Sequence, residues 1–420
     1  MRAAEERPVS AGVRPRPGRE CPQPERGEST TASTIGIGLL GVGWMGEVHS
    51  TSYARVPVHF PECDGRARLV LAADEVPERA DRARLLGYER WTTNWRDVIA
   101  DPEVDAVSIT APNNLHREMA LAAAAAGKHF WGEKPLGRFP SETGEIAAAA
   151  DAAGIRTIVG LNYRNAPAVQ HARALIENGA LGSINHFRMQ FLAGYSANPH
   201  GALSWRFRRD SAGLGVLGDL GSHAVDLAQH LLGPIARVSA TSSIVIPARP
   251  KVERGSGTHF SVVEGGGELG AVENEDWAAA LVEFESGVRG TIELSRSMVG
   301  ANARYLFEAN GTEGAVRWNF ERMNELELHA RTVAGDTGWT TVAMGPEHPD
   351  FARFQPGGGI GMGYDDLKVI EAARFLQSVA DGRQRTPGVR EMDAAARVIA
   401  AIVRSCQSGS WEPVLEGAAA

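Results

Sequence analysis

Cysteine is scarce in this chain. Its 420 residues include only Cys21, Cys63 and Cys406. Their odd number and wide spacing favour a reducing compartment and indicate neither a disulfide framework nor a cysteine metal site. The sequence also lacks an apolar run of the ~20 residues that a membrane-spanning helix requires, and it shows no apolar segment of a secretion signal. We therefore expect a cytoplasmic protein without a membrane partner.

An excess of basic charge is also missing. Lysine and arginine number 43 against 51 acidic residues, which gives a formal net charge of −8. Because there is no basic stripe, nucleic acid is not an expected partner. Residues 1–33 hold five prolines among charged and small polar residues. Such a segment cannot bury enough apolar surface to fold, so we predict a disordered tail.

A glycine-rich turn follows this segment. Residues 35–40 are a short apolar run, which is typical of a buried strand. The run leads into a GxGxxG segment made of Gly41, Gly43, Trp44, Met45 and Gly46. At the start of a helix, the first glycine allows the tight turn and the second lets the backbone approach a pyrophosphate. The third lets helix and strand pack closely, and the free N–H groups of the helix would face the phosphates. The segment predicts a dinucleotide site.

An acidic residue follows the second apolar run. Residues 69–73 end at Asp74, where a second parallel strand would deliver a carboxylate to the ribose hydroxyls. Asp74 lies 28 residues after Gly46, against the roughly 20 that are typical, so we infer an insertion. A carboxylate here favours NAD over NADP because it repels a 2′-phosphate, although Arg79 could soften that preference. The alternative is that Asp74 caps a helix or turn.

Strand and helix patterns alternate from residue 34 to about 160. Further strands are predicted at 104–109, 128–131 and 155–160, with alanine-rich helices between them. This alternation predicts a doubly wound parallel sheet of the Rossmann type.

The second half of the chain predicts two layers. Alternating patterns indicate strands at 280–284 and 290–294, and Asn310-Gly311 is a hairpin signal between 305–309 and 315–318. We expect closing helices at 364–381 and 391–407, and a loop at 248–274.

Five motifs in this order resemble the Gfo/Idh/MocA family of NAD(P)-dependent sugar and cyclitol oxidoreductases. They are the GxGxxG segment, Thr110-Ala111-Pro112-Asn113 with His116, Glu133-Lys134-Pro135, Asn162-Tyr163-Arg164, and Gly218-Asp219-Leu220-Gly221-Ser222-His223. The resemblance implies an α/β fold with an N-terminal Rossmann domain over 34–160. It implies a C-terminal α+β domain over 161–420 with an open, mostly antiparallel sheet. In the family this sheet is also a subunit interface, which implies a homo-oligomer, either a dimer or a tetramer.

Lys134 follows a predicted strand, at the edge where open parallel sheets bind ligands. Its ammonium could stabilise an alkoxide or relay a proton during alcohol oxidation. The alternative is a solvated surface lysine. The flanking Glu133 and Pro135, together with the resemblance, favour the functional interpretation.

Asp219 and His223 are four residues apart, so on one helix they would share a face and could touch. A carboxylate would orient the imidazole and prepare it as a general base. The resemblance implies that both belong to a catalytic set with Lys134, with His223 as the base, although base and relay could be exchanged between Lys134 and His223. Asp226 and His230 continue the same face. One helix spreads the four side chains too far apart for a single ion, so we expect no metal.

Several residues near these motifs are candidate ligand contacts. Cofactor contacts are expected from the GxGxxG segment, Asp74, Arg79, Pro112, Asn113, His116, Glu133 and Lys134. Substrate contacts are expected from Asn162, Tyr163, Arg164, Trp205 and Arg206, which offer hydrogen-bond donors and aromatic surface. A core role for Trp205 and a surface ion pair for Arg164 are the alternatives. The glycine run that the resemblance implies before Asp219 is interrupted here by Leu214, which bears on pocket shape.

These observations lead to one functional hypothesis. The chain is expected to move hydride between NAD, or NADP, and a ring carbon of a cyclic polyol such as an inositol or a pyranose. Two alternatives stay open. Some proteins of this fold use NAD transiently to cleave glycosidic bonds, and others bind nucleotide as regulators without turnover.

Overall fold

The computed structural model describes residues 32–252, 261–264, 267–330 and 338–415, which belong to one compact unit. The predicted tail, residues 1–33, falls almost entirely outside the described residues, and Ser33 is the first residue of strand β1. In the described part of the chain, no helix has the length and apolar character needed to cross a membrane.

The first sheet has six parallel strands in the order β3-β2-β1-β4-β5-β6. They are β1 (Ser33–Leu40), β2 (Gly65–Ala73), β3 (Arg90–Thr92), β4 (Ala106–Ile109), β5 (His129–Gly132) and β6 (Thr157–Val159). Residues 35–40 are buried because helices cover both faces of this strand. The predicted doubly wound sheet is therefore confirmed, with the short edge strand β3 in addition to the predicted strands.

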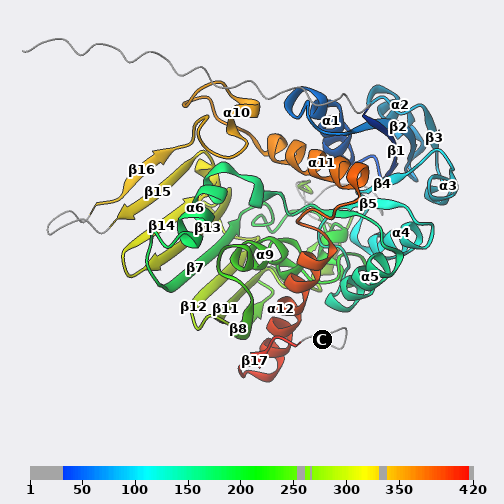
Figure 1. The fold of residues 1–420 in the computed structure, drawn as a ribbon. Helices are drawn as coiled ribbons and strands as arrows, with labels where there is room; N and C mark the ends of the chain where they lie inside the picture. Colours follow the sequence, from blue (N-terminus) through cyan, green and yellow to red (C-terminus); the bar gives the residue numbers. More distant parts are fainter. Residues whose placement is uncertain (1–31, 253–260, 265–266, 331–337, 416–420) are drawn as a thin grey trace, which may run out of the picture. The chain divides into compact units, whose positions relative to one another are not determined.

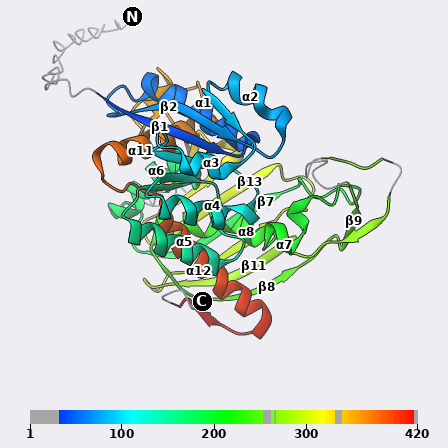
Figure 2. The same cartoon turned by 90° about the vertical axis from the view of Figure 1, so that its right-hand side faces the viewer.

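Helices flank this sheet on two sides (Figures 1 and 2). They are α1 (Trp44–His59), α2 (Ala80–Leu85), α3 (Trp95–Ala100), α4 (Asn113–Ala125) and α5 (Pro140–Ala153). Strand order reverses between β1 and β4, because β1 leads outward to β2 while β4 leads to β5. Ligands of open parallel sheets bind at this switch point, beyond the carboxyl ends of the strands.

The second sheet has nine strands in the order β16-β15-β14-β13-β7-β12-β11-β8-β17. Only β7 and β12 pair in parallel among the described strands of this sheet. The strands are β7 (Ile184–Ala193), β8 (Ile235–Ser243), β11 (Trp277–Phe284), β12 (Arg289–Ser295), β13 (Ala303–Gly311), β14 (Gly314–Asn319), β15 (Glu325–Ala330), β16 (Thr340–Ala343) and β17 (Glu412–Pro413). The open, mostly antiparallel sheet is thus confirmed.

Two predictions for this half had different outcomes. The hairpin at Asn310-Gly311 forms between β13 and β14, with Asn310 paired to Ala315. The expected loop at 248–274 is wrong in part, because β9 (Ala248–Pro250) pairs with β10 (Leu269–Ala271). Residues 253–260 and 265–266 of that segment lie outside the described residues. The two strands were not predicted because each has only three residues and the segment is rich in glycine and glutamate.

Helices of the second half of the chain pack against both sheets. The helices of this half are α6 (Pro167–Glu177), α7 (Arg209–Ala212), α8 (Val216–Asp219), α9 (Gly221–Leu232), α10 (Phe351–Phe354), α11 (Tyr364–Asp381) and α12 (Val389–Ser408). Helix α9 packs on β7 and β12, and α12 packs on β8. The sequence division at residue 160 places α11 and α12 with the second sheet, yet α11 packs on α1 and β2, and α12 packs on α5 (Figure 1).

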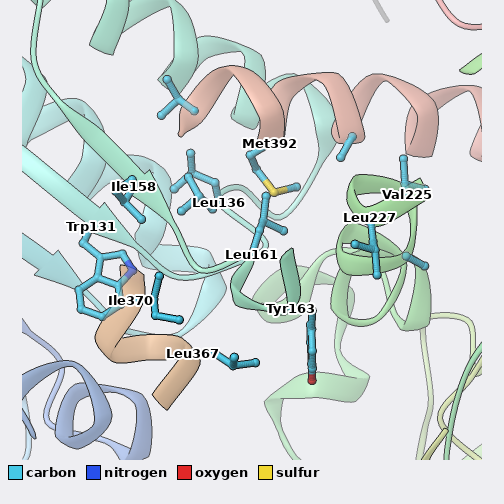
Figure 3. Packing of buried hydrophobic residues seen from close by; sticks show 14 of the residues in the cluster. Trp131, Leu136, Ile158, Leu161, Tyr163, Val225, Leu227, Leu367, Ile370 and Met392 are labelled. Carbon is cyan, nitrogen blue, oxygen red and sulfur yellow. The ribbon is translucent and has the colours of Figure 1, made fainter. Parts of the chain in front are cut away.

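One hydrophobic core therefore runs through both halves. Figure 3 shows Trp131 and Ile158 from the first sheet near Ile370 of α11, and Met392 of α12 near Leu161. Because a shared core holds the halves together, a site at the end of the first sheet can take side chains from both.

Candidate active site

The GxGxxG segment has the geometry that a dinucleotide requires. Gly41 has φ 101°, a left-handed value that favours glycine. A Cβ on Gly46 would lie 2.2 Å from the carbonyl oxygen of Gly41, so close packing excludes any side chain there. A Cβ on Gly43 would meet no atom within 4 Å. The second glycine thus faces open space at the start of α1, where a pyrophosphate would lie.

Asp74 ties the end of β2 to this turn. Its Oδ2 accepts a hydrogen bond from the Val42 N–H at 2.8 Å, and its Oδ1 accepts one from the Val76 N–H at 3.0 Å. Arg79 donates to Oδ2 at 2.6 Å. The carboxylate sits beside the glycine turn as predicted, and the guanidinium of Arg79 is held by Asp74. Contact of either side chain with the ribose stays a prediction.

Lys134 and Asp219 form an ion pair across the two halves of the molecule. Lys134 follows β5, and its Nζ donates to Asp219 Oδ1 at 2.8 Å and to the Asp219 carbonyl oxygen at 3.1 Å. Tyr195, just after β7, donates its hydroxyl to Asp219 Oδ2 at 2.7 Å. Burial raises the pKa of Asp219, but the charges of Lys134 and Arg206 outweigh burial and hold it well below its usual range. Asp219 is therefore an ionised anchor for Lys134.

The predicted contact between Asp219 and His223 is wrong. The helix breaks at Leu220, since α8 ends at Asp219 and α9 begins at Gly221. Both carboxylate oxygens of Asp219 bond instead to Lys134 and Tyr195. His223 lies close enough for the charges of Lys134 and Asp219 to act on it. Burial, followed by the charge of Lys134, lowers the pKa of His223 well below its usual value. The imidazole is consequently neutral, and its role as a base stays a prediction.

Arg164 forms a buried ion pair with Asp226. Its guanidinium bonds to the carboxylate of Asp226, with Nε donating to Oδ2 at 2.6 Å. Both side chains are buried. A buried arginine needs such a partner, because an unpaired charge in the interior is costly. The surface ion pair considered for Arg164 is instead a buried one, and Asp226, taken from the sequence as a polar helix position, is its counter-ion. Substrate contact stays a prediction for Arg164.

Pro112, Asn113 and His116 stand at the start of α4, where the cofactor was predicted to touch them. His116 is buried, and its two ring nitrogens lie 2.8 Å from the Pro135 oxygen and 2.7 Å from the Ala111 oxygen. Asn113 donates its side-chain amide to Ala212. The contacts of His116 and Asn113 support a structural role at the Lys134 turn. Contact of these three residues with the nicotinamide stays a prediction.

Of the other predicted substrate residues, one pair lies beside the ion pair of Lys134 and Asp219, and a second pair is buried. Trp205 and Arg206 lie beside the ion pair, with the Arg206 guanidinium over the Trp205 ring and its Nη1 3.9 Å from Asp219 Oδ1. Asn162 is fully buried. The Tyr163 ring packs edge-on against His223, with ring centroids 4.8 Å apart, and its position is drawn in Figure 3. Substrate contact stays a prediction for all four.

Two aromatic residues of the site were missed. Tyr195 follows β7. This strand was not predicted from the sequence, so the contact between Tyr195 and Asp219 could not be predicted either. Tyr364 begins α11 and lies 6.0 Å from the exposed ring of Trp44 and 6.2 Å from Tyr163, between ring centroids. For Tyr364, the only indication in the sequence was that the helix α11 was predicted to start at residue 364.

Glu133 occupies a buried cluster of charges. Its Oε1 accepts from Lys368 Nζ at 2.6 Å and lies 3.1 Å from His49 Nε2. Lys368 also lies 3.0 Å from Glu371. The carboxylate of Glu133 is thus buried among protein groups, and cofactor contact stays a prediction for this residue. Among the described residues, no group of three or more metal-ligating side chains is placed to hold an ion.

The geometry of the glycine turn predicts that substitution of Gly43 impairs NAD binding and that substitution of Gly46 impairs stability. We expect Gly43→Ala to leave the melting temperature nearly unchanged but to weaken NAD affinity at least tenfold, about 1.4 kcal/mol, because its methyl group enters only the open space. We expect Gly46→Ala to destabilise the fold by about 1–3 kcal/mol through overpacking. Thermal unfolding and titration calorimetry with NAD measure both. Wild-type NAD affinity in Gly43→Ala would contradict the assignment.

Glu371 predicts a pH-dependent stability. Burial raises its pKa to about 7 from 4.5. The folded protein therefore holds a proton that the unfolded chain has released, and the stability contributed by Glu371 falls as pH rises from 4.5 to 7. Relative to Glu371→Gln, we expect wild type to lose about 3 kcal/mol across this window. Urea unfolding at several pH values tests this, with exposed Glu285→Gln as control; a constant difference between wild type and Glu371→Gln would refute it.

Comparison with known proteins places this site in a family. The "Oxidoreductase family, NAD-binding Rossmann fold" matches residues 35–161, and the "GFO/IDH/MocA C-terminal domain" matches residues 169–317. The levoglucosan dehydrogenase of Pseudarthrobacter phenanthrenivorans is 38% identical over 382 residues, which cover 90% of this chain and 98% of the relative. The scyllo-inositol 2-dehydrogenase (NAD(+)) of Bacillus subtilis is 30% identical over 381 residues, covering 90% and 94%.

Solved structures give the same result. Levoglucosan dehydrogenase in complex with NADH and levoglucosan superposes with a TM-score of 0.85 at 37% identity, covering 91% of this chain and 100% of that one. The NAD-binding domain and the dehydrogenase class predicted from the motifs are thereby confirmed. The chain belongs to the Gfo/Idh/MocA family of NAD-binding oxidoreductases.

Proposed function

We propose that this protein is an NAD-dependent dehydrogenase that oxidises a ring hydroxyl of a pyranose, with an anhydrosugar of the levoglucosan type as its first candidate substrate. The observation that carries the chemistry is the ammonium of Lys134, held by Asp219 beside a neutral His223. The similarity to levoglucosan dehydrogenase over nearly the whole chain supports the substrate class. The inositol dehydrogenases are more distant in sequence, so a cyclitol is the second class to test.

The residues of the site divide the reaction between them. NAD, when bound, supplies the hydride acceptor. Lys134 donates a hydrogen bond to the reacting hydroxyl and stabilises negative charge as it develops on that oxygen. His223 is neutral and accepts the hydroxyl proton. Asp219 holds Lys134 in place, while Arg206 and Trp205 offer donors and an aromatic face to the sugar ring.

The cofactor preference follows from Asp74. Its carboxylate stands at the end of β2 beside the glycine turn, where it would accept hydrogen bonds from the ribose hydroxyls and repel a 2′-phosphate. Because Arg79 is engaged by Asp74, its charge is partly neutralised and offers less attraction to such a phosphate. NAD is therefore the proposed coenzyme.

Self-association through the second sheet is also part of the proposal. Helices α9 and α12 pack on one face of this sheet. The opposite face carries polar side chains such as Arg188 and Glu308, together with Leu281, which is 52% exposed. Such a mixed face is compatible with a subunit interface.

A spectrophotometric assay tests the function. Purified protein is given NAD or NADP with levoglucosan, free pyranoses, inositols and glycosides, and absorbance is followed at ~340 nm. We expect NADH to form with levoglucosan or a close relative, and NAD to be preferred. Lys134→Met should lower kcat by at least ~1,000-fold and His223→Asn by ~100-fold, because each removes a group acting in the transition state, while both variants still bind NAD.

Other outcomes of this assay would contradict the proposal. Glycoside cleavage without accumulation of NADH would identify the glycoside-cleaving reaction. Tight NAD binding with no turnover of any sugar would identify a regulator. Full activity of His223→Asn would overturn the assignment of the base.

Tyr195 predicts a separate effect on catalysis. Tyr195→Phe removes the hydroxyl that donates to Asp219, and a hydrogen bond to a charged group contributes roughly 1.5–3 kcal/mol. We expect kcat to fall about 10- to 100-fold with a smaller change in KM. Tyr88→Phe, which removes a hydroxyl 3.3 Å from Ser50, is the control. Equal kinetics for the two variants would show that Tyr195 does not support Asp219.

A further inference from the structure

A second buried ion pair lies next to the catalytic lysine and takes no part in the proposed chemistry. Lys368, in the second turn of α11, is fully buried. Its Nζ lies 2.6 Å from Oε1 of Glu133, the residue before Lys134, although the two partners are 235 positions apart in the chain. The side chain of Glu133 is buried as well. The pair thus connects a helix from the end of the chain to the turn that carries Lys134.

We propose that Lys368 is a positioning residue for Lys134, and that it acts by holding the carboxylate of Glu133. Glu133 connects to Lys134 directly, because its Oε2 lies 3.4 Å from the Lys134 N–H. A shift of the Glu133 side chain therefore shifts the backbone from which Lys134 extends. The inference rests on the proposed dehydrogenase function.

The surroundings leave the carboxylate of Glu133 little freedom. His49 of α1 contacts Oε1 from a second direction, at 3.1 Å. The His49 ring is itself stacked on Trp131, with centroids 3.4 Å apart. After β6, Gly160 approaches so closely that a Cβ there would lie 2.5 Å from Oε1. Helix α1, helix α11 and the end of β6 thus enclose one carboxylate.

Charge explains why a lysine is needed. A buried carboxylate must be paired or it takes up a proton. His49 supplies no positive charge, because burial lowers its pKa to about 4. Burial opposes ionisation of Glu133 and of Lys368, but each charge outweighs that effect on the other, so the pKa of Glu133 lies well below its usual range and that of Lys368 well above. Lys368 is therefore the cation that keeps Glu133 ionised.

Glu371 does not replace this role. It lies 3.0 Å from Lys368 on the same helix and is fully buried. Its pKa of about 7 leaves it largely protonated below neutral pH. The ionised pair is thus Glu133 with Lys368, and the pair is fixed by contacts on three elements.

A double-mutant cycle tests the inference. The variants are Lys368→Met, Glu133→Gln and the double variant, with Lys128→Met as control. Lys128 precedes β5, at the opposite end of that strand from Lys134, and bonds to the carbonyl oxygens of Asp101 and Val104. Measurements are kcat and KM with the sugar found active, NAD affinity, and melting temperature without NAD.

We expect Lys368→Met to lower kcat at least tenfold while NAD affinity stays within threefold of wild type. The double variant should recover at least fivefold in kcat and part of the lost melting temperature, because a neutral amide needs no counter-ion. Lys128→Met should keep wild-type kcat. If Lys368→Met does not fold, the double variant is compared with Glu133→Gln alone, and higher kcat in the double variant supports the inference.

Three results would overturn it. One is a folded Lys368→Met with kcat within twofold of wild type, even if its melting temperature falls. Another is a double variant no better than either single variant. An equal loss of kcat in Lys128→Met would show that removing a lysine from either end of β5 has this effect. Failure of the wild-type protein to oxidise any sugar would contradict the proposed function instead.

Discussion

The ion pair between Lys134 and Asp219 is the interaction on which the site depends. Lys134 is placed by the end of a parallel strand, and Asp219 by a short helix after the second sheet's first strand. Neither half of the molecule contains the site alone. An ion pair of 2.8 Å across this junction requires both backbones to be held accurately. The shared hydrophobic core and the return of α11 and α12 to the first sheet provide that accuracy.

Burial and nearby cations set the protonation states of Asp219 and His223. Asp219 is ionised because the charges of Lys134 and Arg206 outweigh the cost of burying it, and the pKa of His223 is lowered because burial and the charges of Lys134 and Lys368 act in one direction. One arrangement of charge therefore keeps the imidazole of His223 neutral and anchors the ammonium of Lys134. Because the carboxylate oxygens of Asp219 bond to Lys134 and Tyr195, Asp219 holds the lysine rather than the imidazole.

The sequence predicted the parts of the fold that local patterns encode. Apolar runs and the GxGxxG spacing identified the parallel sheet, and α11 was predicted with its observed ends at residues 364 and 381. The motifs also singled out Lys134, Asp219 and His223, and the structure brings the first two together, while their catalytic roles stay predictions. Tyr195, Lys368 and the pairing of Arg164 with Asp226 were not predicted, because each depends on contacts between segments far apart in the chain. The i, i+4 argument failed at Asp219 because it assumed one continuous helix.

The predicted substrate residues Trp205 and Arg206 lie in a segment that the family motifs do not include. Trp205 and Arg206 lie between β7 and α8, and this stretch is fixed by Phe207, which is enclosed by the guanidinium groups of Arg249 and Arg296 at 4.2 and 4.6 Å from its ring centroid. Arg296 is in turn held by the buried carboxylate of Asp276 at 2.8 Å. Lys134 and Asp219 are held by other elements, so under the proposed function we expect changes in this segment to alter substrate preference more than the chemical step.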